Sequence, residues 1–574
     1  GKVETYRGLK IANPDYETLT GGEEDQIHTG RIVPLYPATE GLSQRVLRTV
    51  LYGLVHHPPP DLPDPLPGAL AARRGYPNVR EALAAIHFPA DEASLQRARA
   101  RTVFEELFLQ QVAILRARAR HAEEPGTPLN TDGPRLEAFL RSLPFELTPG
   151  QVRARDAVLA LCRRTRPMHC LLQGDVGSGK TVVAVQAMLA AVDTGLQAAV
   201  MAPTEVLATQ HYFNLKHRLE PLGLKTALLT SSVTGRERRR VEEALSAGAI
   251  HAVVGTHALT QERVVFRELG LVVVDEQHRF GVEQRGRLKA KGRRPHLLVM
   301  TATPIPRSLS LTVFGDLDVA VIDDLPPGRV PVRTRWLPAP AAGEAYAAAR
   351  RELDAGRQAY VVFPVIEESD KTDLKALVRE HERLAAHAFP GRRVGLLHGR
   401  LKTADKERVM AEFQSGAIEV LACTTVVEVG VDVANASVMI VENAERFGLA
   451  QLHQLRGRVG RSDHPSHCFL LGTPGTEEGR RRLEALTATT DGFRLAEEDL
   501  ALRGPGEIFG LRQHGAPDLK LADLVRDAAV VPEARHAARE VLAADPGLAD
   551  PVHAGLRAAY EAVYGARERR ARAG

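Results

Sequence analysis

The chain contains the stretch Gly174-Asp175-Val176-Gly177-Ser178-Gly179-Lys180-Thr181. Its spacing fits G-x-x-x-x-G-K-[ST], a loop whose backbone N–H groups surround nucleotide phosphates. Glycine lets the backbone turn tightly and come close to a phosphate, because no Cβ stands in the way. We expect Lys180 to reach the β- and γ-phosphates and Thr181 to offer its hydroxyl to Mg²⁺.

The residues on either side of this loop fit a phosphate-binding unit. Residues 169–172 form a short apolar run typical of a buried strand, and residues 182–192 are typical of a helix. The helix would begin at the loop and add its dipole to the phosphate site. The alternative is a glycine-rich turn that binds nothing. The strand before the loop and the helix after it favour the nucleotide site.

From about residue 144, short apolar runs alternate with helical patterns, which is typical of a parallel α/β sheet. The first series of expected strands comprises Cys170–Gln173, Ala198–Ala202, Ala227–Thr230, Ala252–Gly255, Leu271–Asp275 and Leu297–Thr301. A break rich in Pro and Asp follows at residues 323–328. The second series comprises Ala359–Val365, Val394–His398, Val420–Cys423, Val438–Val441 and Cys468–Gly472. The sequence therefore predicts an α/β protein with two tandem parallel-sheet domains.

A chain of 574 residues is too long for a single core, so several domains are expected. Residues 1–43 contain short β-like pieces, and residues 44–143 are mostly helical. Residues 144–325 and 326–480 would form the two α/β domains, and residues 481–574 a C-terminal helical segment.

Composition narrows the class of protein. No run of about 18 apolar residues occurs, so nothing in the chain is expected to span a membrane. The four cysteines are scattered without a C-x-x-C pair, which argues against a zinc site or a disulfide framework and suits a reducing cytoplasm. The net charge is only +4, so any nucleic-acid surface must be a local patch. The chain does not begin with Met, and we expect it to be a piece of a longer one.

Two basic stretches each allow two interpretations. Residues 95–120 have the pattern of an amphipathic helix, with apolar positions at Val103, Leu107, Leu109, Ile114 and Leu115 among many Arg and Gln residues. For the basic face of this helix, a solvated surface is favoured over a nucleic-acid contact. Residues 285–294 carry six positive charges and no acidic group. For this second stretch, contact with nucleic-acid phosphates and a solvated loop stay equally open.

Two carboxylates, Asp275 and Glu276, follow the apolar run 271–274. Ligand sites of α/β sheets lie at the carboxyl ends of the strands. Beside a phosphate loop, Asp275 is the expected partner of Mg²⁺, which takes one or two carboxylates with waters and phosphate oxygens. Glu276 is then placed to polarise the attacking water. The alternative, a solvated acidic turn, is disfavoured by the upstream phosphate loop.

A stretch rich in arginine and glycine, residues 454–461, lies in the second α/β series. Arg458 and Arg461 are three residues apart, and therefore on one side of a helix or turn. Planar guanidinium groups suit the charge that develops on a transferring phosphoryl group, the role of an arginine finger. With these arginines in the second domain, the nucleotide would lie between the domains and its hydrolysis would open and close that cleft. The alternative is an RNA-binding or solvated segment.

These motifs together closely resemble the superfamily 2 helicases and translocases. The resemblance is carried by Phe145–Gln151, Ala202–Glu205, Gly255–Ala258, Asp275–His278, Thr301–Arg307, His398–Gly399, Thr424–Asp432 and Gln454–Arg461. It implies two RecA-like domains that use ATP and Mg²⁺, with nucleotide contacts from Gln151, Gly174, Gly177, Gly179 and Gln454. It also implies a second set of residues that contact nucleic acid or couple it to ATP, namely Thr204, Gly255, Thr256, His278, Thr303, His398 and Thr425.

Within that superfamily the chain resembles the RecG family, bacterial helicases that remodel branched DNA. The likeness is carried by residues 28–37 and by residues 491–507 with Gln513. The latter segment resembles a translocation motif shared with the transcription-repair coupling factors, and it implies coupling roles for Arg503 and Gln513. By the same resemblance, residues 1–43 are the trailing edge of an oligonucleotide-binding-type β wedge whose body is missing.

The resemblance implies an ATP-dependent DNA helicase that moves on duplex DNA, reverses stalled replication forks and migrates Holliday junctions in recombination and repair. Its expected partners are branched double-stranded DNA and single-strand DNA-binding protein. We expect a monomer in the bacterial cytoplasm, associated with the nucleoid. Two alternatives stay open: a translocase that acts on stalled RNA polymerase, and a nucleotide-regulated DNA-binding scaffold that does not hydrolyse ATP. The presence of Lys180, Asp275, Glu276, Arg458 and Arg461 argues against the scaffold.

Overall fold

The computed structural model describes residues 2–5, 8–12, 27–28, 30–37, 41–122, 125–276, 286–288, 290–302, 317–326, 330–364, 371–424, 433–462, 464–503, 519–524 and 526–573. The chain divides into two compact units. One is formed by Gly1–Ala117 with Gly515–Gly574, and the other by Arg118–His514. The larger unit contains two parallel sheets, and the smaller one is mostly helical.

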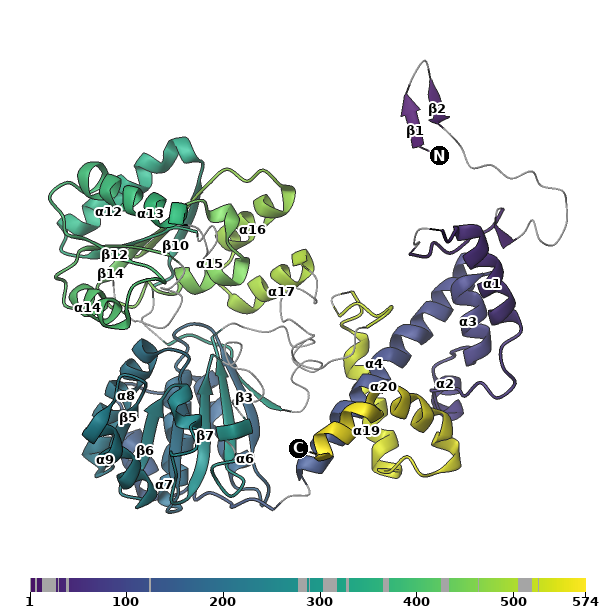
Figure 1. The fold of residues 1–574 in the computed structure, drawn as a ribbon, viewed down its shortest axis with the longest axis horizontal. Helices are drawn as coiled ribbons and strands as arrows, with labels where there is room; N and C mark the ends of the chain where they lie inside the picture. The colour runs from purple at the N-terminus through teal and green to yellow at the C-terminus, as the bar shows by residue number, and fades with distance from the viewer. Residues whose placement is uncertain are drawn as a thin grey trace. The chain divides into compact units, whose positions relative to one another are not determined.

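The first sheet of the larger unit has seven strands in the order β5-β6-β4-β7-β8-β3-β9. Strands β5, β6, β7 and β3 of this sheet are labelled in Figure 1. The paired strands run parallel. They are β3 (His169–Gly174), β4 (Gln197–Met201), β5 (Thr226–Leu229), β6 (Ala252–Gly255), β7 (Leu269–Asp275), β8 (His296–Thr301) and β9 (Asp318–Ile322). Because all strands point the same way, the residues that follow them gather at one edge of the sheet.

Helix α7 (Lys180–Asp193) lies against this sheet and contacts β3, β4 and β7. Every residue from Val182 to Val192 is buried, and all of them except Gln186 are apolar, as expected for a helix that is covered on all sides. Burial of each Val or Leu side chain contributes about 1.5–3 kcal/mol. The loop at the start of α7 is therefore anchored in the core. The other α-helices that the structure describes in this first sheet domain include α5 (Pro134–Ser142), α6 (Pro149–Cys162), α8 (Glu205–Leu219) and α9 (Gly235–Ser246).

The second sheet has six parallel strands in the order β10-β15-β14-β11-β13-β12. They are β10 (Arg333–Leu337), β11 (Gln358–Val362), β12 (Val394–Leu397), β13 (Val420–Cys423), β14 (Ala436–Val441) and β15 (His467–Leu471). Alternate residues of β11 enter different cores, since Tyr360 belongs to one cluster and Val361 to the other. Both faces of the sheet are thus buried, as expected for parallel strands.

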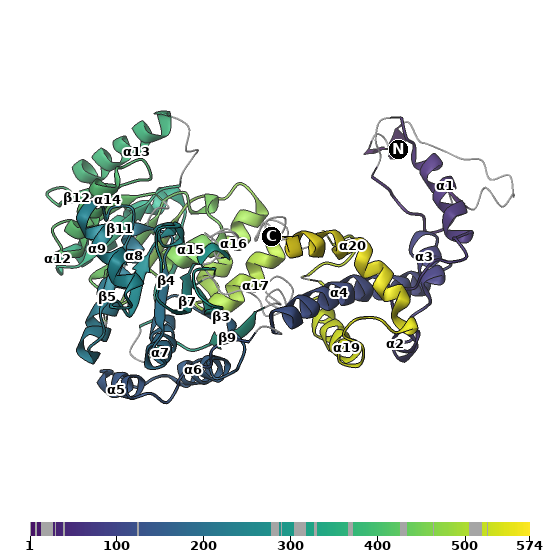
Figure 2. The same cartoon turned by 60° about the horizontal axis from the view of Figure 1, so that its bottom comes forward.

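Within the described residues, six α-helices belong to this second sheet domain. They are α12 (Ala342–Asp354), α13 (Lys371–Arg383), α14 (Thr403–Gln414), α15 (Leu449–Arg456), α16 (Glu477–Ala488) and α17 (Gly492–Arg503). Helices α15, α16 and α17 pack on one another (Figure 2). The two parallel sheets confirm the predicted α/β fold class.

The expected strands of both series are observed; the limits of β6 and β13 are as predicted, and each of the others differs at one or both ends by one to three residues. Strands β9 and β10 were not expected, and both lie at sheet edges. In β10 the side chains of Arg333 and Arg335 are exposed, so the strand lacks the apolar run by which the central strands are recognised.

The smaller unit joins helices from both ends of the chain. Its helices are α1 (Gln44–His56), α2 (Gly68–Arg73), α3 (Val79–His87), α4 (Glu92–Ala122), α19 (Val530–Ala544) and α20 (Ala554–Ala573). The carboxylate of Glu106 on α4 accepts hydrogen bonds from the backbone N–H groups of Lys520, Leu521 and Ala522, at 2.8–2.9 Å. A short antiparallel hairpin, β1 (Lys2–Thr5) with β2 (Leu9–Ala12), is the β element near the N-terminus.

Helix α4 buries a face that differs in part from the expected one. Val103 and Leu107 are buried as predicted, whereas Leu109, Ile114 and Leu115 are only half-buried. Phe104, Phe108 and Val112 complete the buried face. The basic residue Arg101 is also buried, and its guanidinium group forms ion pairs with Asp64 and Glu105.

All four cysteines are free and buried. Burial raises the pKa of the Cys162 and Cys468 thiols to about 12, and it raises the pKa of Cys170 and Cys423 as well. Thiols with such pKa values stay protonated and are poor nucleophiles.

None of the helices in the described part of the chain has the length and apolar character that a membrane span requires.

Candidate functional site

The loop between β3 and α7 has the conformation that its glycines permit. Gly177 and Gly179 have positive φ angles of 76° and 92°, and Gly179 is the N-cap of α7. A Cβ atom on Gly179 would lie 2.3 Å from Nε2 of Gln151. Glycine is therefore required at this position both for backbone conformation and for space. The Oγ atom of Ser178 is buried and has no hydrogen-bond partner among the described residues.

Lys180 is the first residue of α7, directly after this loop, and is largely buried. Its Nζ atom donates hydrogen bonds to the carbonyl oxygens of Gly174 and Asp175, at 2.9 and 2.8 Å. Burial lowers the pKa of Lys180, and the nearby carboxylates of Glu276, Asp275 and Asp175 partly offset that shift. A buried ammonium group, a helix N-terminus and glycines with positive φ angles together form a site that suits a polyphosphate.

Asp275 is the last residue of strand β7, and each oxygen of its carboxylate has a hydrogen-bond partner. Its Oδ2 atom lies 2.8 Å from Nε2 of His211 on α8, and its Oδ1 atom accepts a hydrogen bond from the backbone N–H of Glu276 at 3.1 Å. Burial alone would raise the pKa of Asp275, but the hydrogen bond and charge of His211, together with Lys180, hold that pKa below its ordinary value. The group is thus kept as an anion, the form that binds a divalent cation.

Glu276 follows Asp275 in a left-handed backbone conformation with φ 53°. Such a conformation costs a non-glycine residue about 1–2 kcal/mol. The strained backbone directs the two successive carboxylates of the strand end to one pocket, which both of them line.

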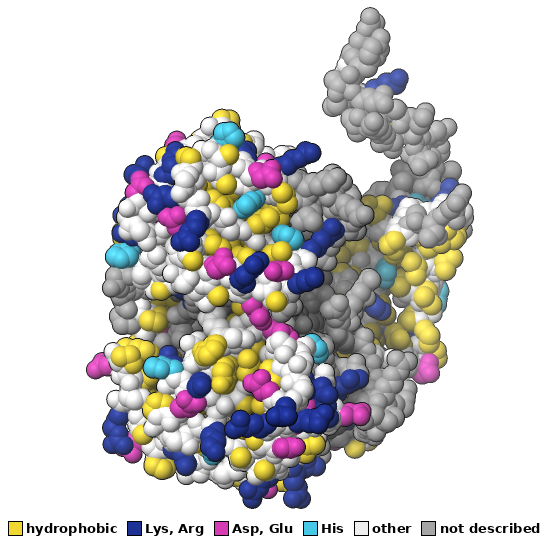
Figure 3. Space-filling model, turned by 60° about the vertical axis from the view of Figure 1, so that its left-hand side comes forward, with side chains coloured by type: hydrophobic (Ala, Val, Ile, Leu, Met, Phe, Trp, Pro, Cys, Tyr) yellow, Lys and Arg dark blue, Asp and Glu magenta, His cyan; other side chains and the backbone are white. Residues whose placement is uncertain are grey.

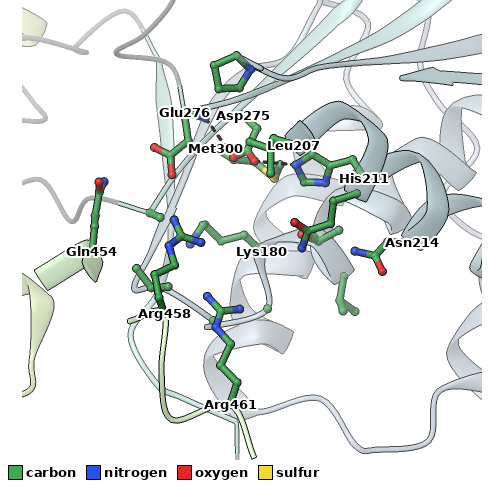
Figure 4. A pocket seen from close by; sticks show the side chains of 18 of the residues that line it. Lys180, Leu207, His211, Asn214, Asp275, Glu276, Met300, Gln454, Arg458 and Arg461 are labelled. Carbon is green, nitrogen blue, oxygen red and sulfur yellow. Dashed lines mark hydrogen bonds and ion pairs between the residues drawn. The ribbon is translucent and has the colours of Figure 1, made fainter. Parts of the chain in front are cut away.

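The pocket has a volume of about 290 Å³ and is lined by residues of both sheet domains. Figure 4 shows Lys180, Asp275 and Glu276 from the first domain facing Gln454, Arg458 and Arg461 from the second. Arg458 is 6% exposed, so its charge lies in a setting of low dielectric. The predicted residues of the pocket lining are Gly177, Gly179, Lys180, Thr181, Asp275, Glu276, Gln454, Arg458 and Arg461.

Gln151 is near this pocket but is not among the residues that line it. It is buried, and its Oε1 atom accepts from the N–H of Thr148 at 3.0 Å while its Nε2 atom donates to the carbonyl of Ser178 at 2.8 Å. The Gln151 side chain therefore links Thr148 to Ser178 and supports the phosphate loop. Its role as a reader of the base stays a prediction.

The predicted nucleic-acid residues of the first sheet domain follow strand ends on the same edge. Thr204 comes after β4 and caps α8, with its side chain accepting from the N–H of Leu207 at 3.3 Å. Gly255 ends β6, where a Cβ atom would lie 2.2 Å from the carbonyl oxygen of Leu229. Thr256 is buried, and its Oγ1 atom has no hydrogen-bond partner within the described residues.

In the second sheet domain, His398 directly follows β12. Burial lowers the pKa of His398, and the charges of Lys406 and Arg400 lower it further. Arg503 is the last residue of α17. Four other predicted residues lie outside the described residues: His278, Thr303, Thr425 and Gln513.

The basic stretch 285–294 is described in part. Lys291 donates hydrogen bonds to the carbonyl oxygens of Gln261 and Val264 at 2.7 and 2.8 Å. One of the six positive charges of this stretch therefore stabilises the fold. Figure 3 shows that Lys and Arg side chains gather over the first sheet domain. On α9, Arg236, Arg239 and Arg240 are exposed.

Two histidines of the site were missed by reasoning from the sequence. His211 holds Asp275, and His453 on α15 lies 2.6 Å from Oδ1 of Asp175 in the phosphate loop. His453 directly precedes Gln454, so its place beside the arginine stretch was the one available signal.

The residues that line this pocket are chemically suited to a nucleoside triphosphate with Mg²⁺. Thr181 and Asp275 line the same pocket as the phosphate loop and supply the hydroxyl and carboxylate that such an ion takes. Within the described residues there is no cluster of three or more His, Cys, Asp or Glu side chains that would hold a metal by itself.

Three protein families match successive parts of the chain. Residues 148–311 match the DEAD/DEAH box helicase family, and residues 344–463 match the helicase conserved C-terminal domain. Residues 489–561 match the family described as ATP-dependent DNA helicase RecG, domain 3, C-terminal.

Curated relatives extend the similarity over most of the chain, and each of these relatives is described as ATP-dependent DNA helicase RecG. The Synechocystis sp. protein is 48% identical over 94% of this chain and 65% of its own length. The Thermotoga maritima protein is 46% identical over 89% of this chain and 66% of its own. The Bacillus subtilis protein is 44% identical over 92% of this chain and 77% of its own. The chain thus spans about two thirds of the length of the first two relatives.

A solved structure, RecG bound to a three-way DNA junction, is similar to this fold with a TM-score of 0.70. It is 41% identical in sequence, and the match covers 92% of this chain and 70% of that one. The similarity in sequence and in fold extends over both sheet domains. This chain belongs to the RecG family of ATP-dependent DNA helicases.

Proposed function

We propose that this chain is an ATP-driven motor that moves on duplex DNA and remodels branched DNA, including stalled replication forks and Holliday junctions. One observation carries the proposal: a single pocket brings the phosphate loop and carboxylates of one sheet domain together with two arginines of the other. A site of this kind is complete only when both domains contribute, so nucleotide turnover is coupled to their relative movement.

Binding is assigned to the first sheet domain. The backbone N–H groups of residues 177–180 surround the phosphates, and Lys180 gives up its two carbonyl contacts to reach the β- and γ-phosphates. Thr181 and Asp275 would hold Mg²⁺, which supplies charge neutralisation on the phosphate oxygens when bound. His211 keeps the Asp275 carboxylate fixed and ionised.

Hydrolysis is assigned to residues of both domains. Glu276 orients and deprotonates the attacking water as a general base. Arg458 and Arg461 stabilise the charge that develops on the transferring phosphoryl group, and the burial of Arg458 strengthens that interaction. Gln454 lines the pocket beside them and completes the nucleotide contacts.

Recognition of DNA is assigned to strand-end residues and to the segment after α17. Thr204, Gly255 and Thr256 would contact the sugar-phosphate backbone, as would His398 in the second sheet domain. His278, Thr303 and Thr425 would couple those contacts to the nucleotide. Arg503 and Gln513 would drive movement along the duplex. Such contacts carry no sequence information, so branch shape decides the substrate.

The proposal also includes the oligomeric state, the cellular location, a protein partner and the domain division. The motor would work as a monomer in the bacterial cytoplasm at the nucleoid, with single-strand DNA-binding protein as a partner. The domain division 1–43, 44–143, 144–325, 326–480 and 481–574 would assign the motor to the third and fourth segments. The relative bound to a three-way junction supports branched DNA as the substrate class.

The test is Glu276→Gln, which keeps the shape of the side chain but removes the base. ATP binding should be retained, and DNA-stimulated ATP hydrolysis should fall by about 10²–10⁴-fold. Glu243→Gln, an exposed change on α9, serves as the matched control and should behave as wild type. Unchanged turnover in Glu276→Gln would remove Glu276 from the role assigned to it.

Substrate class is tested with the wild-type chain on forks, four-way junctions and linear duplex of equal length. We expect hydrolysis and strand separation to be stimulated more by the branched substrates. Equal stimulation by linear duplex would contradict the proposed preference for branches.

A further inference from the structure

Asp175 is an unexpected residue for a loop that receives phosphates, because its carboxylate is an anion only one residue beyond Gly174. Like charges near a polyphosphate weaken binding, and the effect is large in a buried setting. The side chain of Asp175 is 17% exposed, yet Asp175 is not among the residues that line the pocket. A contact must therefore keep the Asp175 carboxylate away from the pocket.

His453 makes that contact from the second sheet domain. Its Nε2 atom lies 2.6 Å from Oδ1 of Asp175, although the two residues are 278 positions apart in the chain. The same oxygen accepts a hydrogen bond from the backbone N–H of Val176 at 2.6 Å. Burial would raise the pKa of Asp175, but the hydrogen bonds from His453 and from the N–H of Val176, together with the charge of Lys180, hold that pKa below its ordinary value. The carboxylate is thus ionised and bound.

The direction of this hydrogen bond follows from Arg456. Its Nη2 atom lies 2.9 Å from Nδ1 of His453. A guanidinium group can only donate, so Nδ1 of His453 must accept and the ring proton must reside on Nε2. The neutral ring then donates to Asp175. Protonation of Nδ1 would place two donors against each other, so Arg456 selects the tautomer that fits the phosphate loop.

Arg456 is itself fixed by the last turn of α16 and by the residues that join α16 to α17. It is buried, and Nη1 donates to the carbonyl oxygens of Leu486 and Thr489 at 2.9 and 2.7 Å. Nη2 also donates to the carbonyl of Thr490 at 3.2 Å. A continuous series of hydrogen bonds therefore runs from these carbonyls through Arg456 and His453 to the phosphate loop.

We infer that His453 is a positioning residue that holds the carboxylate of Asp175 away from the phosphate pocket, with its tautomer set by Arg456. This rests on the proposed function, since it assigns the pocket to a nucleotide. The first sheet domain thus carries a charge that opposes its own ligand, and the second domain restrains that charge. Nucleotide affinity then depends on contact between the domains before any arginine acts.

The test measures equilibrium binding of a fluorescent, non-hydrolysable ATP analogue to the wild-type chain and its variants. His453→Ala frees the carboxylate, and we expect affinity to fall about tenfold, the scale of one hydrogen bond to a charged group. The KM for ATP should rise by a similar factor while kcat changes by less than about threefold. His453→Gln retains a donor and an acceptor, and it should bind the analogue within about threefold of wild type.

Rescue by a second change separates this role from simple packing. Adding Asp175→Asn to His453→Ala removes the freed charge, so affinity should return to within about threefold of wild type. If the double variant binds as weakly as His453→Ala, or if His453→Ala binds as wild type, the inference is wrong. Should His453→Ala unfold, His453→Leu fills the space without the donor and takes its place.

A matched pair elsewhere in the chain provides the control. His553 lies 2.8 Å from Oδ2 of Asp545 in the helical unit. His553→Ala should lower thermal stability and leave affinity for the analogue unchanged. Wild-type hydrolysis that DNA does not stimulate would contradict the proposed function, whereas the binding measurements judge the role of His453 by themselves.

Discussion

Two histidine–aspartate pairs lie beside the pocket, and they differ in what each one joins. His211 and Asp275 are both in the first sheet domain, 64 residues apart, and their contact is part of that domain's own fold. His453 and Asp175 belong to different domains, and their contact exists only while the domains meet. In the proposed mechanism, the first pair would prepare a metal ligand in advance, and the second would make the phosphate loop depend on the other domain.

The same division holds for the whole site. The seven-stranded sheet supplies the groups that would bind the nucleotide, at the ends of β3 and β7. The six-stranded sheet supplies Arg458 and Arg461, which are assigned to the transition state. Changes to Lys180, Thr181 and Asp275 should therefore alter nucleotide binding or metal use, whereas changes to Arg458 and Arg461 should alter turnover. Two residues cross this division: Glu276 of the first domain acts on turnover, and His453 of the second acts on binding.

The largest effect is expected for Arg458→Ala. Loss of an arginine finger lowers kcat by about 10³-fold or more, because it acts on charge that develops only in the transition state. Affinity for the ATP analogue should change little, and single-turnover hydrolysis beside equilibrium binding measures both. Arg446→Ala, an exposed change in the same domain, is the control. Weaker binding with normal turnover would show that Arg458 serves the ground state and would break the proposed division.

An intermediate effect is expected for His211→Ala. Asp275 would lose its partner at 2.8 Å, and changes of such supporting groups cost about 10–100-fold in metal affinity or activity. Hydrolysis should recover partly as the Mg²⁺ concentration rises, whereas the ATP analogue should bind normally in excess Mg²⁺. His217→Ala on the same helix is exposed and should have no effect. If the Mg²⁺ dependence of His211→Ala matches that of wild type, the pair has no role in preparing the metal site.

The smallest effect is expected for Asp324→Ala, in the connection between the sheet domains. Asp324 accepts hydrogen bonds from Oγ1 of Thr148 at 2.6 Å and from the N–H of Gly150 at 2.7 Å. Their loss should lower the free energy of unfolding by about 1–2 kcal/mol, with kcat retained. The neighbouring Asp323→Ala removes only an exposed ion pair with Arg153, and about 0–1 kcal/mol is expected. Equal changes in melting temperature for the two variants would contradict the structural role of Asp324.

Most of the fold could be predicted because its central strands are apolar on both faces and the helices between them are continuous. Val420–Cys423 is an example, since its predicted and observed limits are the same. The edge strand β10 could not be predicted, because its exposed arginines hide the pattern. The contact of Glu106 with residues 520–522 also left no local signal, since it joins positions more than 400 residues apart.

The residues of the candidate site also divide into those that the sequence predicts and those that it does not. Lys180, Asp275 and Arg458 occur in short motifs whose residue types and spacing point directly to chemistry, and the pocket brings them together. His211 and His453 have no such spacing, because their function lies in a partner 64 or 278 residues away. Motifs thus reveal the groups that touch a ligand, and the structure reveals the groups that hold them in place.

The burial of all four cysteines has a practical consequence for measuring domain movement. Their protonated thiols should react slowly with maleimides, so a cysteine introduced on the surface would be labelled selectively without removing the native ones. One label on each sheet domain would then report the distance between domains by fluorescence energy transfer during turnover. The native chain is therefore already suited to single-molecule work.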